Sequence, residues 1–161
     1  MNRKLLGIYL NDHLAGSTGG LELARRSLGS NQGTEFAASL ERLRGELDED
    51  RETLKDLMVR LGVRADQLKV GAAWLAEKAG RLKLNGSLTE YSPLSRLVEL
   101  EALTTGVTGK LSLWQVLSEV KDEPILAAVD FQPLIDRALA QLSLLEEQRR
   151  AAASITFAGS A

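Results

Sequence analysis

Hydrophobic residues recur at intervals of three and four along almost the whole chain, which is the spacing of one face of an α-helix. The first such stretch runs from about Arg3 to Leu28 and the second from about Thr34 to Leu61. A third runs from about Ser92 to Val120, and a fourth from about Pro124 to Ala153 with a second start at Pro133. No segment shows the two-residue alternation of a β-strand. The pattern therefore predicts an all-α protein.

Residues that cap or break helices mark the boundaries of these stretches. Gly29 and Gly62 are expected to end the first and second helices, because glycine readily adopts the left-handed conformation at a helix C-terminus. Ser92 and Pro93 begin the third helix in the positions that serine and proline prefer, the N-cap and the first helical turn.

The lengths of the connections predict how the helices are joined. A shorter helical stretch, roughly residues 65–84, and a polar loop lie between the second and third long helices. Four long helices with short outer connections and a longer middle one describe a four-helix bundle with one crossover. We expect residues 1–153 to form this single domain and residues 154–161 to form a flexible tail.

Composition narrows the function classes. The chain has 161 residues, a net charge of −2 and 4% aromatic residues, so nothing draws it to nucleic acid or to anionic lipid. The absence of cysteine excludes disulfides and thiolate metal sites and fits a reducing cytoplasm. The apolar N-terminal run breaks at Asn11 and Asp12, unlike a secretory signal, and no run approaches the roughly 20 apolar residues of a membrane span.

Two patches of small residues interrupt the predicted helices. Gly16, Gly19 and Gly20 lie within five residues of one another, and the segment Thr104–Gly109 is similarly small. Neither patch matches a phosphate-binding loop, because the first lacks the lysine and Leu111 follows Lys110 in the second where serine or threonine is required. We interpret the patches as a close contact between the first and third helices, in which a leucine at Gly16 or Gly20 would overpack. The alternative is a small-ligand cavity between them.

Polar residues also replace hydrophobic ones near the middle of each apolar face, where helical bundles build cofactor sites. Each of these residues has the ordinary alternative of partial exposure or a hydrogen bond to a neighbour. His13, the single histidine, lies at the edge of its apolar face, where a packed side chain is more common than a metal ligand. The polar residues that interrupt the apolar faces are Ser17, Asp50, Glu99 and Gln141. Their spacing supports no catalytic arrangement.

The order of these parts resembles the ferritin-like superfamily, and more narrowly the bacterial ferritin-like stress proteins. The segments that carry the resemblance are LNDHLAGSTGGLEL, LMVRLG, LVELEALTTGVTGKLSLW and LIDRALAQLSLLEEQR, and the likeness covers about Leu5 to Arg150. The resemblance implies a four-helix bundle with one longer crossover.

In that superfamily a di-iron site uses glutamates and Glu-x-x-His motifs that point into the bundle. By the resemblance, Ser17 stands where the first glutamate would be, Asp50 lies nearest a histidine ligand, and Glu99 matches a glutamate. Gln141 lies near the remaining ligands, and no Glu-x-x-His occurs because His13 is the only histidine. The resemblance thus implies the fold with its di-iron ligands lost.

We therefore expect a non-catalytic ferritin-like bundle with a degenerate metal site. It would have no catalytic, cofactor or metal residues and would act as a homo-oligomer or protein-interaction module in the cytoplasm. The alternative is an iron-binding ferritin-like bundle, an oxidoreductase or a stress-related protein, that uses Asp50, Glu99 and His13.

Overall fold

The computed structural model describes residues 2–67, 91–120 and 122–158. Within these ranges the chain forms helices and connecting turns, with no strand. The four long helices are α1 (Arg3–Ser30), α2 (Ala37–Arg60), α4 (Pro93–Glu119) and α6 (Gln132–Phe157), and a short helix, α5 (Pro124–Ala127), precedes α6. The all-α prediction is confirmed. The shorter helix expected at residues 65–84 falls mostly outside the described residues.

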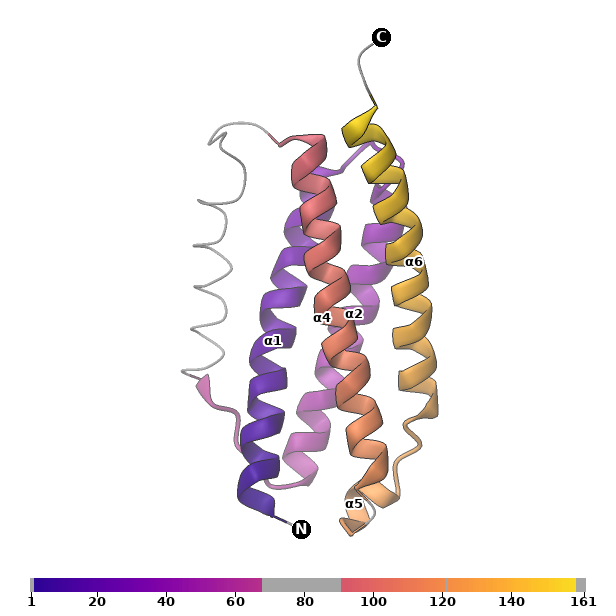
Figure 1. The fold of residues 1–161 in the computed structure, drawn as a ribbon. Coiled ribbons are helices and arrows are strands. Elements are labelled where there is room, and N and C mark those ends of the chain that lie inside the picture. Colours follow the sequence, from indigo (N-terminus) through magenta and orange to yellow (C-terminus); the bar gives the residue numbers. More distant parts are fainter. Residues whose placement is uncertain (1, 68–90, 121, 159–161) are drawn as a thin grey trace.

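The long helices lie side by side and alternate in direction between neighbours (Figure 1). α1 packs mainly on α2, and α4 packs mainly on α6. α1 also packs along α4, whereas α2 and α6 make few contacts. α2 ends at the end of the molecule opposite to the start of α4 (Figure 1).

Most helix boundaries follow the predicted signals. Ser92 caps α4, its hydroxyl accepting a hydrogen bond from the Ser95 amide at 3.2 Å, and Pro93 follows it. Gly62 ends α2 with a positive φ of 69°. The second start of the last stretch is confirmed, because α5 and α6 are separate helices.

The end of α1 differs from the prediction. Gly29 is helical and α1 continues to Ser30, so the expectation that Gly29 stops the helix is wrong. Asn31 caps the helix instead, donating from Nδ2 to the Ser27 carbonyl at 2.7 Å. The positive φ in this turn belongs to Gly33, at 76°. The side-chain amide of Asn31 thus donates to a carbonyl of the last helical turn. The prediction had assigned the end of this helix to a glycine in the left-handed conformation.

Two other helix boundaries also differ from the prediction. α2 begins at Ala37 rather than at Thr34, because Thr34 forms a turn in which its hydroxyl donates to the Asn31 carbonyl at 2.7 Å. α6 continues to Phe157, past the expected end at Ala153. Residues 154–157 therefore extend a helix rather than begin the tail.

Two hydrophobic clusters fill the space between the helices. One includes Trp114, Phe131 and Leu10 at the end where α1 begins and α4 finishes. The other includes Phe36, Leu100 and Leu145 toward the opposite end. Asp50 on α2 lies between Leu47, which packs on the second cluster, and Leu54 of the first. A polar level therefore separates the two clusters along this helix.

Candidate functional site

A buried ion network occupies the polar level between α2, α4 and α6. Asp50 on α2 is 3% exposed. Its Oδ2 accepts a hydrogen bond from Lys110 Nζ on α4, and its Oδ1 accepts one from Arg137 Nη2 on α6. Two cations from two helices therefore neutralise one buried carboxylate, as the burial of a charge requires.

Gln141 joins this network from α6. Its Oε1 accepts a hydrogen bond from Lys110, and its Nε2 donates to Glu46 Oε2 at 2.9 Å. The amide thus presents its acceptor to the cation and its donor to a carboxylate. The sequence identified Asp50 and Gln141 as polar interruptions of the core, and the structure brings these two together.

The sequence reasoning missed the residue at the centre of the network, Lys110. The signal was present, because Lys110 follows Val107 by three residues and precedes Trp114 by four, which places it on the apolar face of α4. Burial lowers the pKa of the Lys110 amine, and the carboxylate of Asp50 partly opposes that effect. Its ammonium donates hydrogen bonds to both Asp50 and Gln141.

Glu99 does not reach this level. It lies 11 residues before Lys110 on α4, which corresponds to about 16 Å along a helix. Its Oε1 accepts a hydrogen bond from Arg26 Nε at 2.9 Å and its Oε2 accepts one from the Tyr91 hydroxyl at 3.1 Å. The structure therefore keeps Asp50 and Glu99 apart, and the metal site that would combine them with His13 is not formed.

The partners of Glu99 belong to a second polar cluster at the Asn31 end of α1. The Tyr91 hydroxyl accepts a hydrogen bond from Asn31 Nδ2 at 2.7 Å, and Arg96 donates to Asn31 Oδ1. Burial and the nearby charge of Glu99 raise the pKa of Tyr91 to about 12. The cluster ties the start of α4 to the end of α1, which is a structural role.

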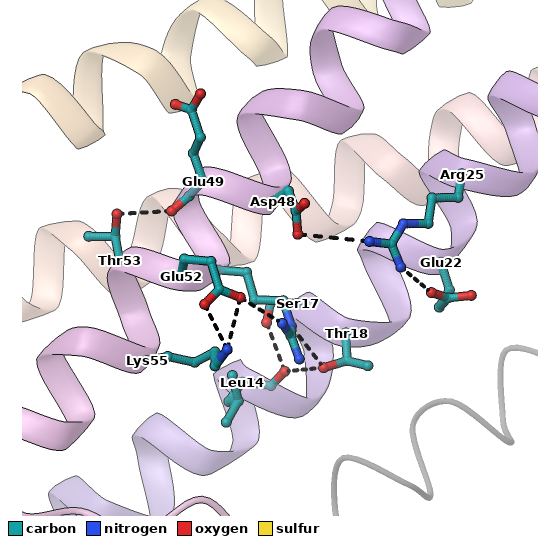
Figure 2. A network of polar contacts seen from close by, with 11 residues as sticks. Leu14, Ser17, Thr18, Glu22, Arg25, Asp48, Glu49, Glu52, Thr53 and Lys55 are labelled. Atoms are coloured by element: carbon teal, nitrogen blue, oxygen red, sulfur yellow. Dashed lines mark hydrogen bonds and ion pairs between the residues drawn. The ribbon is translucent and has the colours of Figure 1, made fainter.

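Ser17 forms a hydrogen bond within its own helix, which is the ordinary alternative to a metal-ligand role. Its hydroxyl donates to the Leu14 carbonyl in the preceding turn at 2.8 Å, as that of Thr18 does at 3.0 Å. Figure 2 shows both contacts beside the charged side chains that face one another across α1 and α2, including Arg25 between Glu22 and Asp48. The hydroxyl of Ser17 is hydrogen-bonded within its own helix. Its place on the apolar face therefore needs no role as a metal ligand to explain it.

A cavity of about 220 Å³ lies between α1, α2 and α4. Its mouth includes the exposed residues Gly16 and Gly106, and its base includes the buried side chains of Leu54, Leu103 and Trp114. Both patches of small residues line it, and so do Asp50 and Lys110, so the cavity borders the ion network.

The cavity corrects the interpretation of the glycines as a close helix contact. A Cβ atom built at Gly16, Gly20, Gly106 or Gly109 meets no atom of the described residues within 4 Å. A contact that only glycine permits would place such an atom much closer. The glycines therefore widen a cavity between the helices, which is the alternative that the sequence left open.

His13 borders the same cavity. Its ring packs edge-on against Tyr9, with 4.6 Å between the ring centroids. Burial lowers the pKa of His13, although the charge of Asp12 partly opposes this. The imidazole thus packs as an aromatic ring against Tyr9.

Within the described ranges, no group of three or more histidine, aspartate or glutamate side chains has the geometry to hold a metal ion. No helix of the described part is long and apolar enough to cross a membrane. Comparisons with protein-family models, with curated proteins and with solved structures found no match.

Proposed function

We propose that this chain is a non-catalytic ferritin-like helical bundle in which an internal ion network replaces the metal centre. In this proposal it acts as a structural or protein-interaction module. The helix order supports the proposal, because two antiparallel pairs, α1 with α2 and α4 with α6, are joined by a connection between opposite ends (Figure 1).

The observation that carries the proposal is the pairing of Asp50 with both Lys110 and Arg137. A divalent cation at Asp50 must displace two hydrogen-bonded cations, and it is repelled by both while they remain. Lys110 also uses the side-chain oxygen of Gln141, a second oxygen ligand at this level. The network thus occupies two of the side-chain groups whose oxygen atoms a hard cation would need.

Metal analysis tests the proposal. The protein is incubated with ferrous iron or manganese, desalted and analysed by inductively coupled plasma mass spectrometry, with Asp50→Asn and Asp48→Asn as paired variants. Asp48 is the matched control, because it lies on the same helix with a side chain that is 41% exposed. We expect no stoichiometric metal in any of the three proteins. Near-stoichiometric metal that is lost in Asp50→Asn but kept in Asp48→Asn would overturn the proposal.

Exposed hydrophobic side chains support the interaction role. Leu5 is 61% exposed and Val59 is 76% exposed, and they lie on α1 and α2 at the end where α1 begins and α2 finishes. We propose that this end contacts a second copy of the chain. Light scattering coupled to size-exclusion chromatography should give a mass above that of the 17.5 kDa monomer, and Val59→Glu should reduce it. A monomer at all protein concentrations would contradict this assignment.

A further inference from the structure

We propose that the cavity between α1, α2 and α4 admits small aldehydes and captures them as an imine on the side-chain amine of Lys110. This inference goes beyond the proposed function and does not depend on the absence of metal. It rests on the position of Lys110 between the cavity and the ion network, on an ammonium donor without a partner, and on the groups that can move its proton.

Lys110 lies where the ion network meets the cavity. Lys110 and Asp50 both line the cavity, which has a volume of about 220 Å³. Arg137 and Gln141 complete the contacts of the network from α6, which contributes no residue to the lining. The Lys110 side chain is 12% exposed, whereas that of Asp50 is 3% exposed. The lysine is therefore the member of this ion pair that a molecule in the cavity can more readily reach.

One hydrogen-bonding position of the Lys110 ammonium is open. An ammonium has three N–H donors, and Asp50 Oδ2 and Gln141 Oε1 accept hydrogen bonds from two of them. The third donor has no partner among the residues that the structure describes. Donors in such buried surroundings are usually paired. The nitrogen thus keeps one position for a group that enters from outside the network.

The network can also hold the lysine in its neutral form, which is the form that attacks a carbonyl carbon. Burial lowers the pKa of the Lys110 amine. The charges of Asp50 and Glu46 oppose this effect, and that of Arg137 adds to it. Arg137 also donates a hydrogen bond to Asp50 Oδ1, so the buried carboxylate keeps one cation when Lys110 is neutral.

Asp50 can carry the proton through the reaction, because its Oδ2 already accepts a hydrogen bond from Lys110. The carboxylate takes a proton from the ammonium, and the neutral nitrogen forms a bond to the aldehyde carbon while the electron pair of the C=O bond moves to oxygen. A second proton then moves from nitrogen to that oxygen. Asp50 returns its proton to the resulting hydroxyl group, the C–O bond breaks, and water leaves. The product is a protonated imine with the charge of the original ammonium, so Asp50 keeps a cationic partner.

The lining favours a small aldehyde with an apolar, uncharged substituent. The buried side chains of Leu54, Leu103 and Trp114 form the base of the cavity. Its volume of about 220 Å³ exceeds the roughly 150 Å³ of an engineered apolar cavity that binds benzene. A charged substituent would bring an uncompensated charge into a partly buried site, which is unfavourable. Benzaldehyde meets these requirements and serves as the probe.

Reductive trapping tests the proposal. The protein is incubated at pH 7 with benzaldehyde and sodium cyanoborohydride, which reduces an imine to a stable secondary amine, and peptide mass spectrometry quantifies the benzylated lysines. Lys55 is the internal control, because its side chain is 42% exposed and pairs with Glu52 on the surface of α2. We expect Lys110 to be labelled about tenfold faster than Lys55. The rate at Lys110 should also saturate as the benzaldehyde concentration rises, because a cavity binds the aldehyde first.

Matched variants locate the reaction. Gly16→Leu places a side chain at the mouth of the cavity and should slow labelling of Lys110 by about tenfold without changing that of Lys55. Gly45→Leu is the control, because Gly45 is also helical with no described atom within 4 Å of an added Cβ but does not line the cavity. Lys110→Arg keeps the cation without the amine and should abolish the saturable labelling. Gly20→Leu is a second blocking variant if Gly16→Leu does not fold, as judged by circular dichroism.

Any of three results would contradict the proposal. The first is that Lys110 is labelled no faster than Lys55. The second is a rate at Lys110 that rises in proportion to the benzaldehyde concentration without saturation, as expected for an amine that reacts without a binding site. The third is equal labelling of Lys110 in the blocking variants and in Gly45→Leu. None of these results would change the outcome of the metal analysis, which tests the proposed function separately.

Discussion

Lys110 on α4 donates a hydrogen bond to the buried carboxylate of Asp50 on α2, and this contact joins two helices that run in the same direction. Arg137 on α6 contacts the same carboxylate. Asp50 therefore links α2 to both helices of the α4–α6 pair. Because α2 and α6 make few contacts, the network is a main polar connection between these two helices.

Lys110→Met should lower the free energy of unfolding by about 3 kcal/mol, because it leaves a buried carboxylate with one of its two cations. Urea denaturation at pH 7, followed by circular dichroism, measures the change. Lys55→Met is the control, since Lys55 pairs with Glu52 at 2.7 Å on the exposed surface of α2, where loss of the pair should change stability by less than about 1 kcal/mol. Equal effects of the two variants would contradict the importance of the buried contact.

The double variant Asp50→Asn with Lys110→Met should be less destabilised than the sum of the two single variants. Each single change leaves the other residue buried without its partner, whereas the double change removes both charges. A complete thermodynamic cycle by urea denaturation provides the coupling energy. Additive effects would show that the two residues do not act as a pair.

Gly20→Ala should raise the free energy of unfolding by about 1 kcal/mol, since alanine favours the helix and its Cβ has room. Gly62→Ala should lower it by about 1 kcal/mol, because its φ of 69° is unfavourable for a residue with a Cβ. Thermal melts of both variants test the contrast. A lower melting temperature for Gly20→Ala would restore the interpretation of a close helix contact.

The stability of the protein should fall as the pH rises from about 10 to about 12, with Tyr91 as one cause. The folded-state pKa of Tyr91, about 12, lies above the ordinary tyrosine value of 10.0. A raised folded-state pKa stabilises the protein fully below the unfolded-state pKa, and this contribution is lost as the pH passes through the folded-state value. Ultraviolet titration of tyrosinate in a Tyr9→Phe background isolates this group, since the chain has two tyrosines.

Glu99→Gln should lower the pKa of Tyr91 in the same titration, because the charge of Glu99 is one of the groups that raise it. Glu101→Gln is a control on the exposed surface of α4. An unchanged titration midpoint in Glu99→Gln would show that burial alone sets the value.

Ser92→Ala should lower the free energy of unfolding by about 1 kcal/mol, because it removes the hydroxyl that caps the first turn of α4. Ser112→Ala is the matched control, since Ser112 is partly exposed in the interior of the same helix and its hydroxyl donates only to the Thr108 carbonyl at 3.1 Å. Chemical denaturation of the two variants separates the cap from a general effect of losing a serine. Similar small changes in both would contradict the capping role.

The sequence alone determined where the helices lie, because that information is local. Periodic leucines predicted α1, α2, α4 and α6, and Ser92 with Pro93 predicted the start of α4. At the end of α1, where the prediction failed, distant contacts accompany the observed cap. Asn31 rather than Gly29 ends α1, and it is held there by Tyr91 and Arg96, which are 60 or more residues away in the chain.

The sequence also located the polar level, since Asp50 and Gln141 interrupt their apolar faces. It did not reveal how they are paired, because a lysine on the apolar face of α4 has no assigned partner until the helices are packed. The tertiary structure placed Lys110 between Asp50 and Gln141 and kept Glu99 with Arg26. It also decided that the glycines border a cavity, because the distance between two helices depends on every side chain along their interface and not on the glycines alone.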